Sequence, residues 1–113
     1  IVFEKDEPFL VIGSPGGSRI ITAVLQIILN VIDFEQSLEE ATDSKRVHHQ
    51  WYPDDIDIEE NYNQISELMD LGYTIDIIDT ATCTQSIMID SVKFIGVSDL
   101  RRPDSLALGV KND

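Results

Sequence analysis

Residues 13–21 read Gly13-Ser14-Pro15-Gly16-Gly17-Ser18-Arg19-Ile20-Ile21 and join the apolar run Phe9–Ile12 to a longer apolar segment. A strand, a glycine turn and a helix in this order leave free backbone N–H groups at the positive end of the helix dipole. Such a place suits an oxygen that carries negative charge. The stretch therefore predicts a strand–turn–helix unit and a position where charge can be stabilised, without naming a reaction.

The segment after this turn is predicted to be a helix over Ser18–Phe34, with Ser18 as its N-cap. Its apolar residues follow the spacing of three and four that marks one helix face. Ile27 and Leu29 widen this face beyond what an amphipathic surface helix carries. We therefore expect the helix to lie deep in a body larger than this chain.

Length and composition point to one globular domain. The chain has 113 residues, 42% of them hydrophobic, and a formal net charge of −13. So negative a chain repels phosphate backbones and anionic lipid surfaces, which argues against nucleic-acid binding. The first residue is Ile1, inside a predicted strand and with no signal-peptide pattern before it. We therefore expect a piece of a longer precursor.

The remaining periodicities predict a mixed α/β (α+β) fold with mostly antiparallel strands. Two β-hairpins are expected, one between Ile1–Phe3 and Phe9–Ile12 and one around Asp90-Ser91. The run Phe9–Ile12 is apolar throughout, so both of its faces are expected to be covered. Ser37 and Glu40 have the spacing of a capping box, and Gly72 suits the end of a helix. The tail from Asp99 to Asp113 is expected to be irregular. The other predicted helices are Ser37–Thr42 and Asn63–Leu71, and the predicted strands are Ile1–Phe3, Phe9–Ile12, Arg46–Trp51, Ile56–Glu59, Tyr73–Ile78, Thr84–Ile89 and Val92–Val97.

Four polar features outside the turn have a structural interpretation that we favour over a functional one. Adjacent His48 and His49 on a strand point to opposite faces, so they are expected to be packed histidines, although His49 stays open as a general base. Arg101-Arg102 is expected to neutralise nearby carboxylates. The single cysteine, Cys83, has no zinc-ligand partners and is expected to be a small buried side chain. The acidic group lacks the ligand spacing of a calcium loop and is expected to be a solvated edge: Asp54, Asp55, Asp57, Glu59 and Glu60.

Gly16 and Gly17 leave two interpretations open. Taken alone, two glycines most often mark a tight turn without a ligand. The run lacks the closing Gly-Lys-Ser/Thr of a P-loop and the glycine spacing of a dinucleotide site. Their N–H groups can instead converge on the oxyanion of an acyl-transfer intermediate. The hydroxyls of Ser14, Ser18 and Thr84 have no identifiable base, so no nucleophile accompanies this site.

Several blocks together resemble the small subunit of γ-glutamyltranspeptidases. They occur in that family's order and span Ile1 to about Gly109. The blocks are Gly13–Ile20, Glu40-Ala41-Thr42, Arg46-Val47-His48-His49-Gln50-Trp51, Leu71-Gly72-Tyr73, Thr84-Gln85-Ser86-Ile87 and Ser98-Asp99-Leu100-Arg101.

The resemblance implies an N-terminal-nucleophile hydrolase with an αββα sandwich, produced by self-cleavage of a precursor. It implies transfer of the γ-glutamyl group of glutathione to water or to an acceptor amino acid or peptide, without cofactor or metal. Gly16 and Gly17 would then supply the oxyanion hole. The family's threonine nucleophile lies upstream of Ile1, so residues 1–113 resemble the C-terminal part of the small subunit and are expected to be inactive alone. The expected partners are the rest of the small subunit and the large subunit, in an extracytoplasmic location.

Three alternatives stay open. A related acylase acting on cephalosporin side chains or poly-γ-glutamate would use the same glycines. A non-catalytic module would hold a phosphate-like anion at Gly16-Gly17, against the charge of −13. A stand-alone acidic interaction domain would have a closed core and no large exposed apolar surface.

Overall fold

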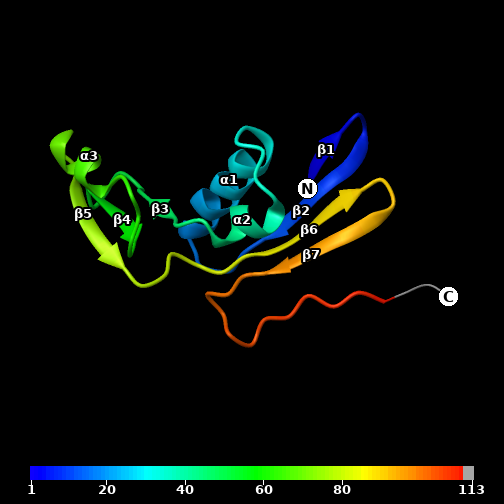
Figure 1. The fold of residues 1–113 in the computed structure, drawn as a ribbon. Helices are drawn as coiled ribbons and strands as arrows, with labels where there is room; N and C mark the ends of the chain where they lie inside the picture. The colour runs from blue at the N-terminus through cyan, green and yellow to red at the C-terminus, as the bar shows by residue number, and fades with distance from the viewer. Residues whose placement is uncertain (111–113) are drawn as a thin grey trace.

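A computed structural model describes residues 1–110 of the chain as two β-sheets joined by helices (Figure 1). Figure 1 shows the larger sheet at one end, the smaller sheet at the other, and the first two helices between them. The helices are α1 (Arg19–Ile32), α2 (Leu38–Asp43) and α3 (Ile65–Asp70), and the strands are β1 (Val2–Glu4), β2 (Glu7–Gly13), β3 (Val47–His48), β4 (Asp55–Glu59), β5 (Thr74–Ile78), β6 (Gln85–Asp90) and β7 (Lys93–Ser98).

The larger sheet is antiparallel throughout, with strand order β1-β2-β6-β7. The two hairpins predicted at its edges are both present. β2 and β6 are far apart in sequence but adjacent in the sheet, so Val11 pairs with Ile87, which pairs with Gly96 on β7. This pairing brings the end of β2, and the glycine turn that follows it, beside the start of β6.

The hydrophobic core lies between one face of this sheet and helices α1 and α2. Ala23, Ile27 and Val31 are spaced by four and form the buried stripe of α1. Each aliphatic side chain that is fully buried contributes roughly 1.5–3 kcal/mol. The core cluster consists of Leu10, Ile27, Val31, Leu38 and Ala41.

The opposite face of the larger sheet is apolar and largely exposed within residues 1–110, although Ala107 of the C-terminal segment lies beside it at Gly96. Because side chains alternate along a strand, Val11 points away from buried Leu10, and it is 37% exposed. Its neighbours Ile87 and Phe94 are exposed as well. We had expected both faces of the β2 strand to be covered, and only one is covered within the described residues.

The smaller sheet has the order β3-β4-β5 and contains the one departure from antiparallel pairing in the described chain. β4 and β5 run parallel because α3 carries the chain back between them. The strand predicted over Arg46–Trp51 is shorter, with β3 confined to Val47–His48. Trp51 has a φ of 74°, a left-handed conformation that a strand does not tolerate.

Helix α1 differs from its prediction at both ends. Ser18 occupies the predicted N-cap position directly before Arg19, but it has helical angles (φ −62°, ψ −29°) and its side chain makes no capping hydrogen bond. The helix ends at Ile32, two residues earlier than predicted. The capping box of α2 is confirmed, since Ser37 and Glu40 each accept from the other's backbone N–H.

The chain exposes more surface than a closed domain of its size. Its accessible surface is 8124 Å², against roughly 6,200 Å² for a compact monomer of the same mass. Its radius of gyration is 15.6 Å, against about 13 Å for a compact domain of this length. Ile21, Leu25 and Ile32 on α1 contribute to this excess, which fits the expectation that α1 has neighbours outside this chain. None of the helices in residues 1–110 has the length and apolar character needed to cross a membrane.

The isolated chain should therefore bind an apolar reporter dye and self-associate, because α1 and the opposite face of the larger sheet each expose apolar side chains. The double substitution Ile21→Gln with Leu25→Gln should lower dye fluorescence and the associated fraction measured by light scattering. Val92→Gln is the matched control, since Val92 is 89% exposed on a hairpin tip away from both faces. A sharply melting monomer without dye binding would contradict the expectation.

Candidate functional site

The glycine turn connects the end of β2 to the start of α1, as predicted. Gly16 and Gly17 both have positive φ, of 125° and 61°. A φ of 125° is essentially restricted to glycine, whereas 61° lies in the left-handed region that other residues enter at a cost. Among residues 1–110, the N–H groups of Gly16 and Gly17 have no protein acceptor. They are exposed donors at the positive end of a 14-residue helix.

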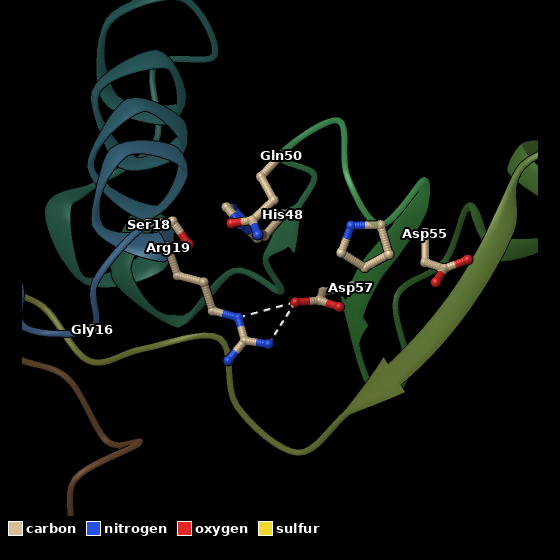
Figure 2. A pocket seen from close by; sticks show the side chains of 8 residues that line it. Gly16, Ser18, Arg19, His48, Gln50, Asp55 and Asp57 are labelled. Atoms are coloured by element: carbon tan, nitrogen blue, oxygen red, sulfur yellow. Dashed lines mark hydrogen bonds and ion pairs between the residues drawn. The ribbon is translucent and has the colours of Figure 1, made fainter.

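A polar cavity of about 230 Å³ lies beside this turn (Figure 2). Arg19 crosses it from the start of α1 and donates to Asp57 on β4, with Nη2 2.6 Å and Nε 3.0 Å from Oδ2. The pair holds the beginning of α1 against the smaller sheet. The cavity is lined by Gly16, Ser18, Arg19, His48, Gln50, Pro53, Asp55 and Asp57.

The two histidines occupy different environments, and the expectation of a packed side chain is confirmed for His48 but wrong for His49, which is exposed. His48 is 5% exposed, and its Nδ1 lies 2.8 Å from the hydroxyl of Thr22. His49 is exposed and its Nε2 lies 3.0 Å from Asp54 Oδ1. His49 does not line the cavity beside the glycine turn, so its geometry does not support a role as general base there.

The acidic group near β4 is not the solvated edge that we expected. Glu59 is 1% exposed and belongs to the interior, and Asp57 is paired with Arg19. Asp54 and Glu60 do lie on the surface. Within residues 1–110, no three His, Cys, Asp or Glu side chains are placed to hold a metal ion.

Four buried charges form an ion cluster that the sequence did not reveal. Arg46 Nη2 lies 2.7 Å from Asp99 Oδ2, and Arg101 Nη2 lies 2.6 Å from Glu59 Oε2. Arg101 Nη1 also lies 3.1 Å from Asp99 Oδ1, which joins the two pairs. Arg101 does pair with a nearby carboxylate, Asp99, as expected, but that carboxylate and its second partner Glu59 are among the most deeply buried side chains. Arg102, its neighbour, is exposed.

The cluster also forms hydrogen bonds with backbone groups of the segment 81–84. Asp99 Oδ2 accepts from the N–H of Thr84 at 2.8 Å, and Glu59 Oε1 accepts from the N–H of Ala81 at 2.9 Å. Arg46 Nη1 donates to the carbonyl of Thr82 at 2.7 Å. The segment 81–84, which leads into β6, is therefore fixed from inside the molecule.

The electrostatics of the cluster keep all four groups charged. Burial by itself raises the pKa of Glu59, but its hydrogen bonds with Arg101 and Ala81 outweigh that effect and bring the pKa below its ordinary value. Burial likewise raises the pKa of Asp99, and the N–H groups of Arg101 and Thr84 with the charge of Arg46 reverse this. Burial, and then the like charge of Arg101, lowers the pKa of Arg46, although a guanidinium stays protonated in proteins.

The turn itself is attached to segment 81–84. The hydroxyl oxygen of Ser14 lies 2.7 Å from the carbonyl oxygen of Cys83 and 2.9 Å from Thr82 Oγ1. Cys83 is half-buried and contributes its backbone rather than its thiol. Buried charges, segment 81–84 and the glycine turn thus form one connected structure.

Comparisons with known proteins identify close relatives. The family model for γ-glutamyltranspeptidase matches residues 1–109. The chain is similar to the glutathione hydrolase proenzyme of Escherichia coli, with 40% identity over 112 residues, covering 96% of this chain and 19% of that protein. It spans about a fifth of the length of that protein and of the glutathione hydrolase proenzyme of Pseudomonas sp. (strain A14).

Solved structures similar to this chain include γ-glutamyltranspeptidases, the family that the sequence comparison also found. The γ-glutamyltranspeptidase from Pseudomonas nitroreducens complexed with L-DON has a TM-score of 0.89 and 34% identity, covering 98% of this chain and 60% of that one. A cephalosporin acylase from Bacillus halodurans has a TM-score of 0.77 at 20% identity, covering 87% of this chain and 19% of that one, a likeness of fold alone. The predicted class, a portion of an N-terminal-nucleophile hydrolase with mostly antiparallel strands, is confirmed.

Acid should unfold the protein by protonating the cluster. Glu59 and Asp99 have folded-state pKa values below the ordinary 4.5 and 3.8, so their contribution is complete above those values and is lost as pH falls through the folded-state ones. Thermal midpoints measured from neutral pH downward should therefore fall most steeply below pH 4.5.

The variant Asp99→Asn should be less stable at neutral pH by about 3–5 kcal/mol, because it leaves Arg46 buried without its anion. Its midpoint should also depend less on pH than that of the unmodified protein, since one titrating group is gone. Asp104→Asn is the matched control, an exposed carboxylate in the same segment. Equal pH dependence in all three proteins would show that the cluster does not control acid stability.

Proposed function

The chain belongs to the γ-glutamyltranspeptidase family, and we propose that it forms the C-terminal part of the small subunit of a γ-glutamyltransferase and glutathione hydrolase. In this proposal residues 1–113 are one structural piece, and its partners are the rest of the small subunit and the large subunit of the same precursor. The excess surface and the exposed apolar faces support such partners.

The proposed reaction is acyl transfer through a covalent intermediate. A threonine hydroxyl from outside this sequence attacks the γ-carbonyl carbon of glutathione, and a tetrahedral intermediate with an anionic oxygen forms. The amide C–N bond then breaks, the amine leaves with a proton, and the γ-glutamyl group stays on the threonine oxygen as an ester. Water or the amine of an acceptor attacks this ester in turn and releases the enzyme.

In this reaction the glycine turn stabilises the anionic oxygen. The observation that carries the assignment is the pair of exposed N–H groups of Gly16 and Gly17, which have no acceptor in residues 1–110 and stand at the start of α1. Preorganised donors of this kind act when charge develops, and removing one typically costs about 10²–10³ in rate.

A non-catalytic anion-binding module is less well supported. The cavity beside the glycines is lined by Asp55 and Asp57, and its one arginine is already paired with Asp57. A phosphate placed there meets two carboxylates and no free cation among the lining residues. A related acylase acting on cephalosporin side chains or poly-γ-glutamate would use the same glycines, so substrate assays separate it from the proposed function.

Alanine substitutions at Gly16 and at Gly17 should lower the activity of the assembled enzyme to different extents. Alanine at Gly16 requires a φ of 125° and places its Cβ 2.6 Å from Thr82 Oγ1, so the turn must move. We expect kcat for a γ-glutamyl anilide to fall by about 10²–10³. Alanine at Gly17 meets no atom within 4 Å and adopts a tolerated φ of 61°, so kcat should fall by no more than about tenfold.

Gly13→Ala is the control for these variants, because Gly13 has no positive φ and open space around its Cβ position. Its kcat should match that of the unmodified enzyme. Full activity in the Gly16→Ala enzyme would remove the support for an oxyanion hole at this turn.

The 113-residue polypeptide by itself should not hydrolyse a γ-glutamyl anilide, because the proposed nucleophile lies outside it. Release of the anilide chromophore, compared with buffer, measures this directly. The assembled enzyme is the positive control and should also be tested on cephalosporin and poly-γ-glutamate substrates. Turnover by the 113-residue polypeptide above the buffer rate would contradict the assignment of the nucleophile.

A further inference from the structure

We propose that Thr82 is a positioning residue for the oxyanion hole: its hydroxyl holds the Pro15–Gly16 peptide so that the N–H of Gly16 points toward the developing charge. The inference rests on the proposed function of the glycine turn. Thr82 lies in the segment between β5 and β6, 66 residues after Gly16, and is 9% exposed. Neither its position nor its residue type suggested this role in the sequence.

The geometry of one peptide unit carries the argument. Thr82 Oγ1 donates to the carbonyl oxygen of Pro15. This carbonyl belongs to the same planar peptide as the N–H of Gly16, and the peptide is trans. In a trans peptide the C=O and N–H bonds point in opposite directions. A bond that fixes the carbonyl of Pro15 toward Thr82 therefore fixes the N–H of Gly16 away from it.

The hydroxyl proton of Thr82 joins segment 81–84 to the glycine turn whichever acceptor it is donated to. Its hydroxyl has one proton, and the two acceptors within reach are the carbonyl oxygen of Pro15 and the hydroxyl oxygen of Ser14. Both acceptors belong to the glycine turn. The proton of Ser14 can go to Pro15 in its own turn, or to Cys83 or Thr82 in segment 81–84, so only the proton of Thr82 always passes between the two segments.

Packing adds a second constraint on the same peptide. The space where a side chain at Gly16 would project is occupied by Thr82, whose Oγ1 and Cβ lie 2.6 Å and 3.1 Å from an ideal Cβ. Thr82 therefore fills the space beside Gly16 that a side chain would need. Rotation of the Pro15–Gly16 peptide would break the hydrogen bond between Thr82 and the carbonyl oxygen of Pro15.

Thr82 is itself held firmly enough to act as a reference point. Its carbonyl accepts from Arg46 at 2.7 Å, and its neighbour Ala81 donates to Glu59 at 2.9 Å. Threonine is also branched at Cβ, which restricts its χ1 angle. The position of its hydroxyl is thus set by the buried ion cluster rather than by the turn that it orients.

The test compares three variants in the assembled, processed enzyme. Thr82→Val keeps the shape and removes the proton, Thr82→Ala removes the hydroxyl without placing a methyl group against the carbonyl of Pro15, and Thr82→Ser keeps the hydroxyl. Thr80→Val is the matched control, an exposed threonine of the same segment. The measurements are kcat and KM for a γ-glutamyl anilide, with a thermal midpoint for each protein.

We expect kcat to fall by about tenfold in Thr82→Val and Thr82→Ala, which is the effect of losing one hydrogen bond. KM should not change, because the oxyanion forms only after the nucleophile has attacked. Thr82→Ser should keep kcat within about twofold despite a similar change in thermal midpoint, which a purely structural role would not produce. The alanine variant decides the case if the valine variant does not fold.

Unchanged kcat in Thr82→Ala, or an equal loss in Thr82→Ser, would overturn the inference. A loss confined to KM would overturn it as well, because the hydroxyl would then serve ground-state binding. These results leave the proposed function standing, since the unmodified enzyme stays active. An unmodified enzyme without γ-glutamyl turnover would overturn the proposed function, and this inference with it.

Discussion

The structure depends on bringing two arginines and two carboxylates out of water together. Arg46, Glu59, Asp99 and Arg101 have zero net charge as a group, and their remaining donors and acceptors are met largely by backbone. Removing one member of such a group costs about 3–5 kcal/mol, far more than an exposed pair is worth. Glu59 ends a strand of the smaller sheet and Asp99 follows a strand of the larger one. The cluster is therefore the joint between the two sheets.

Contacts that lead back to this ion cluster fix the conformation of the glycine turn. The buried arginine fixes the carbonyl of Thr82, and the hydroxyl of Thr82 meets the peptide that carries the N–H of Gly16. A flexible turn with two glycines would lose preorganisation, since glycine has more backbone freedom than any other residue. Here the conformational freedom that allows a φ of 125° is removed by contacts from a distant segment. The conformation needs glycine, and its persistence needs the rest of the fold.

Local signals predicted the local elements well. The hairpins, the helix after the glycine turn and the Ser37–Glu40 capping box all follow from patterns within a few residues. The strand–turn–helix pattern marked Gly16 and Gly17 as a place for negative charge, and the family resemblance favoured an oxyanion hole over a turn without a ligand. The contacts that were not predicted are long-range. Glu59 was expected to be solvated because its sequence neighbours are acidic, whereas its arginine partner, Arg101, lies 42 residues away. The same holds for Thr82, because no periodicity marks a side chain whose partner is 67 residues distant.

The ion cluster places different constraints on substitution at the neighbouring residues Arg101 and Arg102. A change at Arg101 leaves Glu59 buried without an arginine and leaves Asp99 with Arg46 alone, and only a simultaneous change in its partners could restore neutrality. Arg102 is exposed, so it can drift to almost any polar residue without such compensation. Neighbours with the same chemistry thus accept substitutions at different rates. Positions 46, 59, 99 and 101 are expected to vary as a set, or to stay fixed together.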